Sequence, residues 1–145
     1  MTGTQITLVK ASFKKIELVE EEAAVLFYAR LFELDPALRR LFKDDMSEQR
    51  FKLMQMLEFA VQGLENLAEL IPAVRALGAR HVGYGVKEEH YETVGSSLLW
   101  TFGHALGEEF TAEMKEAWTA VYNLLAETMQ DGASQVPAKT SGKST

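Results

Sequence analysis

The chain has 145 residues, 47% of them hydrophobic and 25% charged, which is the size and composition of one ordinary globular domain. Its formal net charge of −6 argues against non-specific nucleic-acid binding, which requires a basic surface. The absence of cysteine excludes disulfides, thiolate metal sites and iron–sulfur clusters. The N-terminus lacks the blocks of a signal peptide, and no apolar run approaches the roughly 20 residues of a membrane helix, so we expect a cytoplasmic protein without membrane insertion.

Apolar residues recur at steps of three and four along most of the chain, which is the period of an α-helix. No segment shows the strict alternation that is typical of a half-buried strand. Each stripe of apolar residues would bury one face of a helix. The four stripes comprise Val25, Tyr28, Ala29 and Phe32; Leu53, Leu57, Ala60, Val61, Leu64 and Ala68; Tyr91, Val94, Leu98, Phe102 and Leu106; and Met114, Trp118, Val121, Leu125 and Met129.

Proline, glycine and capping residues divide this pattern into separate helices. Asp35 before Pro36 is typical of a helix start, and Pro72 is expected near the beginning of another helix. Gly83, Gly85 and Gly107 indicate helix ends. The pattern predicts helices near 5–18, 21–34, 36–41, 47–68, 70–82, 88–106 and 111–131. About seven helices of unequal length favour an all-α fold packed at steep angles around a pocket over a symmetric four-helix bundle.

The last residues differ in composition from the rest of the chain. From Gly132 onward they are mainly small and polar, and cannot build a hydrophobic core. We therefore expect one domain over 1–131 and a disordered tail over 132–145.

The chain contains three histidines, of which His81 is the candidate metal ligand. A lone histidine at a helix end is more often structural than a ligand, but Leu77 lies one turn before it on the same face. The predicted 47–68 helix offers a polar residue and an apolar wall, because Gln49 and Leu53 share one face. His90 and His104 are expected at the surface.

Five motifs in order and spacing together carry a family resemblance. They are Leu-Phe-Tyr at 26–28, Asp-Pro-Ala-Leu-Arg-Arg-Leu-Phe at 35–42, Leu-Gly-Ala-Arg-His at 77–81, Gly-Val-Lys-Glu-Glu-His-Tyr-Glu-Thr-Val-Gly at 85–95, and Ala-Trp-Thr-Ala-Val-Tyr at 117–122. Through about Met129 the chain resembles the globin family, specifically the single-domain bacterial globins and the haem domains of flavohaemoglobins, and it is similar to neuroglobin. The resemblance implies a globin fold that binds one haem b.

The resemblance also implies a role for each matching residue. His81 matches the proximal iron ligand, and Tyr28 and Gln49 match the distal residues that face the bound gas. Phe42 matches the phenylalanine that stacks on the haem, and Leu53 the apolar residue beside the gas. The further cofactor-binding positions are Lys52, which often pairs with a haem propionate, and Leu77, Val86 and Tyr91.

Simpler roles remain open for several of these side chains. Phe42 and Leu53 could be ordinary core residues, and Gln49 could be a solvated helix residue. Lys52 could be exposed, where an ion pair contributes only ~0–1 kcal/mol. The pattern predicts that Tyr28 is buried, so its hydroxyl requires a hydrogen-bond partner.

Two distal donors predict the gas preference. Bound O₂ carries partial negative charge, and the Tyr28 hydroxyl and the Gln49 amide can both donate to it in a dry pocket. CO carries less charge and gains less. We therefore expect tight O₂ binding with slow release, with CO and NO as further ligands.

One departure concerns the proximal side. In flavohaemoglobins a tyrosine and a glutamate polarise the proximal histidine; Tyr91 matches the tyrosine, but the glutamate position falls at Ala133. Glu127 lies six residues earlier and is expected on a different face. The sequence therefore predicts a weakened push toward O–O cleavage. The reductase domains of flavohaemoglobins are also absent from this sequence, so steady turnover is expected to need an external reductase.

These features leave several functions open. The first is O₂ storage, scavenging or transfer; the alternative enzymatic function is nitric-oxide dioxygenation with a separate reductase. Gas sensing is disfavoured because no output domain follows. A haem-free helical regulator would require the motif match to be coincidental.

Overall fold

A computed structural model describes residues 1–83 and 85–135, and it contains only helices and their connections within these residues. The prediction of an all-α fold is confirmed. The elements are α1 (Gly3–Glu17), α2 (Glu20–Leu34), the 3₁₀ helix η1 (Pro36–Leu41), α3 (Ser47–Gly63), α4 (Leu67–Gly83), α5 (Glu88–Leu106), the 3₁₀ turn η2 (Gly107–Glu109) and α6 (Ala112–Ala133). None of these helices is both long and apolar enough to span a membrane.

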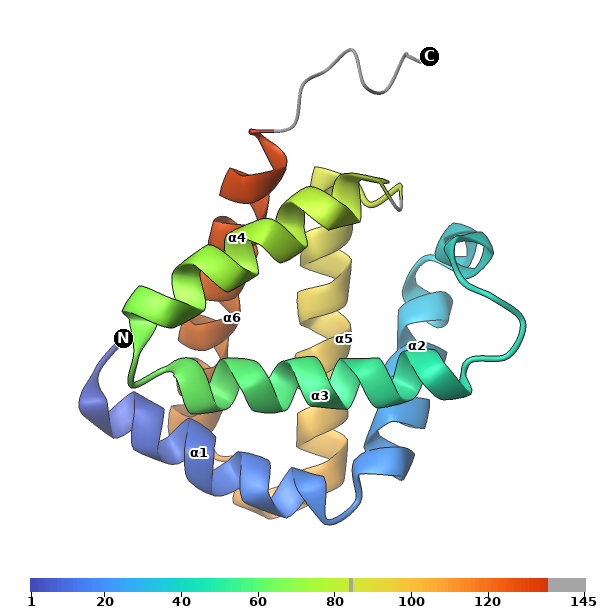
Figure 1. Ribbon diagram of the computed structural model, residues 1–145. Coiled ribbons are helices and arrows are strands. Elements are labelled where there is room, and N and C mark those ends of the chain that lie inside the picture. The colour runs from blue at the N-terminus through green and yellow to red at the C-terminus, as the bar shows by residue number, and fades with distance from the viewer. Residues whose placement is uncertain (84, 136–145) are drawn as a thin grey trace.

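The helices cross at steep angles (Figure 1). The most extensive contacts are those of α4 with α6 and of α2 with α5. The α1 helix packs on α6, α3 and α5 at one end of the molecule, whereas α3 contacts α1, α2 and α4. This arrangement leaves α3 and α4 diverging from their short connection at residues 64–66 (Figure 1).

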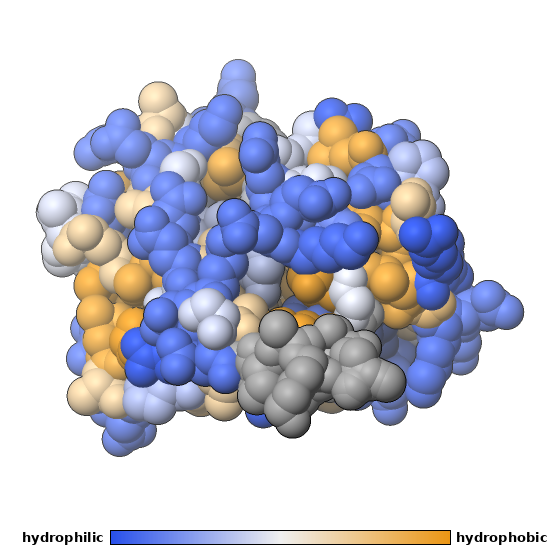
Figure 2. Space-filling model, turned by 90° about the horizontal axis from the view of Figure 1, so that it is seen from above, coloured by the Kyte–Doolittle hydropathy of each residue, from blue (hydrophilic) through white to orange (hydrophobic). Residues whose placement is uncertain are grey.

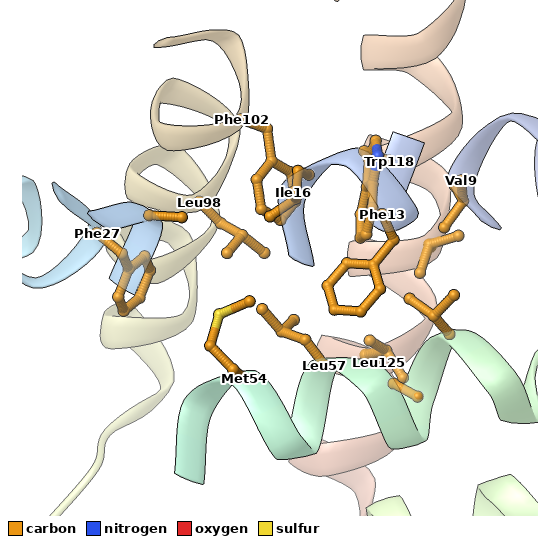
Figure 3. Packing of buried hydrophobic residues seen from close by; sticks show 14 of the residues in the cluster. Val9, Phe13, Ile16, Phe27, Met54, Leu57, Leu98, Phe102, Trp118 and Leu125 are labelled. Carbon is orange, nitrogen blue, oxygen red and sulfur yellow. The ribbon is translucent and has the colours of Figure 1, made fainter. Parts of the chain in front are cut away.

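The core is centred on Trp118 of α6, which is 2% exposed (Figure 3). Its ring lies 4.4 Å from that of Phe102 and 6.2 Å from that of Phe13, so it joins α5 and α1 to α6. The indole Nε1–H donates to Ser12 Oγ over 2.8 Å. The polar end of this large side chain is therefore satisfied inside the core, as buried polar groups require.

The predicted 47–68 helix is divided in the structure. α3 ends at Gly63 and α4 begins at Leu67, earlier than the predicted start at 70. The Asn66 carbonyl accepts from the backbone N–H groups of Glu69 and Leu70, and Leu70 packs so closely on Gly63 that a Cβ there would lie 3.0 Å from Leu70 Cδ1. Because the chain folds back at this point, Ala68 is exposed and does not continue the α3 stripe.

Pro72 lies inside α4 and not near its start, so that prediction is wrong. A proline has no N–H to donate to the carbonyl four residues earlier, which here belongs to Ala68. Ala68 is exposed, and water can satisfy its carbonyl. This position therefore tolerates the proline.

The buried face of α2 is offset by one residue from the predicted stripe. Val25 and Ala29 are exposed, whereas Ala24, Phe27 and Leu31 are buried with Tyr28. This face packs on several elements, since α2 contacts α5, α3 and η1. Ser97 Oγ of α5 donates to the Phe27 carbonyl over 2.7 Å, at the centre of this face.

The last helix extends beyond the predicted domain end at 131. Gly132 and Ala133 belong to α6, and Gly132 is buried where the helix meets α4. Its lack of a side chain permits this approach, which composition alone does not reveal. Residues 136–145 of the predicted tail lie outside the described part of the chain.

Candidate functional site

The candidate site lies where α3 and α4 are farthest apart. Gln49 is in the first turn of α3 and His81 is in the last turn of α4, both at the ends opposite the connection (Figure 1). Leu53 and Leu77 add partly exposed apolar side chains to the same helices. The face at which α4 ends and α5 begins shows hydrophilic residues together with several groups of hydrophobic residues (Figure 2).

Tyr28 is held on α2 with its hydroxyl in a defined hydrogen bond. The side chain is 6% exposed, and Gln49 Nε2–H donates to its oxygen over 3.0 Å. Burial raises the pKa of Tyr28 to about 12, although the Gln49 hydrogen bond opposes the shift. The phenol is therefore protonated at neutral pH, and its own hydrogen remains a donor.

Phe42 meets Tyr28 at the end of η1. The two rings are 5.6 Å apart at 71°, and Phe32 is also 5.6 Å from Phe42 in an edge arrangement. Such edge contacts are favoured between aromatic rings. The structure thus brings together three of the predicted site residues: Tyr28, Gln49 and Phe42.

Arg39 organises the loop after Phe42, and the sequence analysis did not identify it. Its guanidinium donates to the carbonyls of Phe42, Lys43 and Asp44 over 3.4, 3.0 and 3.1 Å. The group also lies over the Phe32 ring, 5.5 Å from its centroid. The sequence shows only that an arginine stands three residues before the loop. Its partners are backbone carbonyls, which every residue has, so the sequence does not reveal them.

His81 is oriented by a backbone bond within α4. Its Nδ1 lies 2.8 Å from the Leu77 carbonyl, an acceptor that requires the proton to be on Nδ1. The lone pair is then on Nε2, which is the form that ligates a metal. Burial lowers the pKa of His81 and favours the neutral ring, while the Leu77 hydrogen bond opposes this shift.

Gly85, which follows the end of α4, lies against η1. The Val86 N–H donates to the His81 carbonyl over 3.1 Å, so Val86 is tied directly to the end of α4. Gly85 adopts a φ of 88°, which favours glycine, and a Cβ there would lie 3.4 Å from Leu41 Cδ2. Leu41 directly precedes Phe42. The contact of Gly85 with Leu41 therefore brings the end of α4, which carries His81, close to the end of η1, which carries Phe42.

Lys52 and Tyr91, the two other predicted cofactor contacts, have the following surroundings. Lys52 is exposed and pairs with Glu48 over 3.6 Å. Tyr91 is buried in the first turn of α5, where burial raises its pKa. Glu127, expected on a different face, lines the same open hollow of about 500 Å³ between α5 and α6 as Tyr91.

The other two histidines have local contacts of their own. His90 Nδ1 accepts from the Lys87 N–H over 2.9 Å at the start of α5, and His104 stacks on Trp100 with ring centroids 5.1 Å apart. His104 is exposed, as predicted, and His90 is half-buried.

The site offers a neutral histidine as a metal ligand. Within residues 1–83 and 85–135, no cluster of three or more histidine, aspartate or glutamate side chains could hold a metal ion. A single neutral imidazole suits an iron whose other ligands come from a macrocycle, and the partly exposed apolar residues suit its faces. The fold and the site therefore define an all-α protein whose residues fit a haem.

The chain belongs to the globin family, whose model matches residues 25–129. It is 30% identical to neuroglobin-1 of Oncorhynchus mykiss over 91% of this chain and 92% of that protein. It is 29% identical to the flavohemoprotein of Vibrio cholerae over 90% of this chain, and spans 34% of that protein's length. The predicted family is confirmed.

Solved structures agree with this assignment. An engineered carbene transferase, made from a Rhodothermus marinus protein assigned as a nitric oxide dioxygenase, matches with a TM-score of 0.86 and 26% identity over 97% of this chain and 99% of that one. A bacterial globin of Campylobacter jejuni matches with a TM-score of 0.82 and 27% identity over 92% and 97% of the two chains. The predicted globin fold is thus confirmed.

Proposed function

We propose that this globin holds one haem b through His81 and binds O₂ tightly for storage, scavenging or transfer. The observation that carries the proposal is the bond between Gln49 and Tyr28, which leaves a protonated, buried phenol with a hydrogen to donate. A donor fixed in advance in a dry site stabilises a partly anionic ligand more than water would.

When bound, the haem supplies an iron atom with one coordination position open to a diatomic gas. His81 provides the protein ligand through Nε2, and the Leu77 carbonyl fixes the orientation of its ring. Phe42 and Leu53 supply apolar contact on the side of Tyr28, whereas Leu77 and Val86 supply it beside His81. Lys52 would exchange its exposed partner Glu48 for a propionate.

Nitric-oxide dioxygenation is the second candidate. It is supported by the match to a flavohemoprotein and to a protein assigned as a nitric oxide dioxygenase. Conversion of NO and O₂ to nitrate requires one electron, which a haem held by His81 would supply. Tyr28 and Gln49 would orient the O₂ in both functions, and a separate reductase would return the electron.

The test is an absorption spectrum of the purified protein in the ferrous form, alone and with O₂ or CO, for the wild type and His81→Ala. The wild type should take up haem and change its spectrum with each gas. His81→Ala should lose or misligate haem, and the chain should become less stable because a ligand specific to the folded state is lost. An unaltered spectrum with normal O₂ binding in His81→Ala would exclude His81 as the ligand.

The two candidate functions are separated by adding NO to the protein saturated with O₂. Nitrate formed in a fast single turnover, and sustained turnover only after a reductase is added, would favour dioxygenation. No fast nitrate formation would favour storage or transfer.

A further inference from the structure

The backbones of α4 and α6 touch directly at two glycines. A Cβ added to Gly78 would lie 1.9 Å from the Met129 carbonyl oxygen, and one added to Gly132 would lie 1.9 Å from the Arg75 carbonyl oxygen. Both distances are far inside the closest approach of non-bonded atoms. Both obstacles are main-chain atoms, which cannot rotate away as a side chain could. Any side chain at either position therefore requires one helix to move.

The two contacts are reciprocal. Gly78 and Arg75 are three residues apart on α4, and Gly132 and Met129 are three residues apart on α6, so each helix supplies one glycine and one carbonyl. Beside them Arg75 Nε donates to Asp131 Oδ2 over 2.8 Å. We call Gly78, Gly132 and the two carbonyls the glycine clamp.

The α4 half of the clamp lies just before His81 in the chain. Gly78 precedes His81 by three residues and follows Leu77, whose carbonyl accepts from the His81 ring. Among the described helices, α4 packs on α6 and α3, and α3 diverges from it toward His81 (Figure 1). The position of this end of α4 therefore depends on its contact with α6.

We propose that Gly78 and Gly132 are positioning residues that set the distance and tilt of His81 relative to the haem iron. The inference rests on the proposed role of His81 as the iron ligand. A helix displaced at Gly78 carries the Leu77 carbonyl and the His81 ring with it, because Leu77 is adjacent to Gly78 and His81 lies three residues further on.

The experiment compares Gly78→Ala and Gly132→Ala with Gly83→Ala in the haem-loaded protein. Gly83 also lies in α4, but a Cβ there has no atom within 4 Å, so it adds the same methyl group without a clash. The readouts are the iron–histidine stretching band of the ferrous, gas-free protein by resonance Raman, the rate of haem loss, and the unfolding of the haem-free chain in urea.

Both clamp variants should shift the iron–histidine band in the same direction and lose haem about tenfold faster, a change of about 1.4 kcal/mol. Gly83→Ala should match the wild type. Gly132→Ala is the sharper variant, because it is 51 positions from His81 in sequence and cannot act through the helix propensity of α4. The double variant should shift less than the sum, since one displaced helix relieves both contacts.

Loss of stability in urea with an unmoved band would reduce the clamp to a packing feature and overturn the proposal, as would equal shifts in Gly83→Ala. If Gly78→Ala does not fold, Gly132→Ala decides alone, because it lies in the last turn of α6 and leaves the sequence of α4 unchanged. A wild-type protein without any iron–histidine band, or His81→Ala that keeps it, would instead refute the proposed function.

Discussion

Gln49 donates a hydrogen bond to Tyr28 over 3.0 Å, across 21 residues of sequence and between two helices. The amide can donate to the hydroxyl oxygen only when the phenol is placed at the start of α3, and the edge contact with Phe42 fixes the ring there. Because the Tyr28 oxygen accepts from Gln49, the phenol O–H can donate to an acceptor that enters the site. The polar pair that we propose for the gas-binding side is thus positioned by α2, α3 and η1 together.

Replacing Tyr28 with phenylalanine should accelerate O₂ release. The ring and its packing stay, but one donor to a partly anionic ligand is lost, which is worth roughly 1.5–3 kcal/mol. O₂ dissociation measured by stopped flow should rise by about one to two powers of ten. CO carries less negative charge, so its dissociation should change much less.

Gln49→Leu should act in the same direction with a smaller effect, because glutamine supports the phenol and lies nearer to solvent. The double variant should be non-additive if both side chains act as one network. O₂ dissociation rates that are unchanged in both single variants and in the pair would assign Tyr28 and Gln49 a structural role.

Arg39→Ala should loosen the loop that follows Phe42. Three carbonyls lose one shared cationic donor, and the partial exposure of Arg39 limits the cost to about 1–3 kcal/mol. Haem loss to an acceptor protein should become faster, with little change in the spectrum of the loaded form. Arg40→Ala is the matched control, since that neighbouring side chain is exposed. Equal rates in the two variants would contradict a role for Arg39 in holding the loop.

Ser12→Ala should destabilise the fold without affecting the gas site. It leaves the Trp118 indole N–H buried without a partner, which costs about 1–3 kcal/mol. The free energy of unfolding in urea measures this loss, and exposed Ser96→Ala provides the control. Trp118→Phe removes the indole N–H that Ser12→Ala would leave without a partner. Adding Ser12→Ala to Trp118→Phe should therefore lower the free energy of unfolding little further. If the effects of the two substitutions simply add, the hydrogen bond contributes nothing to stability.

Elements with strong local signals could be predicted from the sequence. Asp35 and Pro36 predict a helix over 36–41, and the structure has a 3₁₀ helix over the same residues. The Asp35 side chain accepts from the Ala37 N–H at its start. Long periodic segments such as the last helix were also predictable. The division at 64–66 was not, because apolar spacing continues past Gly63 while the Asn66 carbonyl that begins α4 is a backbone feature.

The candidate site shows the same limit. His81, Tyr28, Gln49 and Phe42 followed from a family resemblance, yet their contacts depend on crossings between helices that sequence periodicity does not encode. Periodicity locates the buried face of a helix only to within about one residue. For this reason the predicted apolar stripe of α2 does not include Phe27, which is buried. The glycine clamp could not be predicted for a similar reason. No feature of the sequence around Gly78 indicates that the backbone of Met129 packs against it.

The last prediction uses the pKa of Tyr28, which burial raises to about 12 from its usual 10.0. Between these two values the unfolded chain loses the phenol proton while the folded chain keeps it. The free energy of unfolding must therefore fall by up to about 3 kcal/mol as pH rises from 10 to 12. Below pH 10 the phenol is protonated in both states, so the stability contributed by the buried, protonated Tyr28 is fully present there. Tyr28→Phe has no proton to retain, so urea unfolding of the haem-free chain at pH 9, 10, 11 and 12 should give a shallower loss than in the wild type. Some loss should persist, because burial raises the pKa of Tyr122 in the same direction, and Tyr122→Phe reports that share separately. Identical slopes for wild type and Tyr28→Phe would mean that the phenol is solvated in the folded chain, and the argument for a dry distal donor would fail with it.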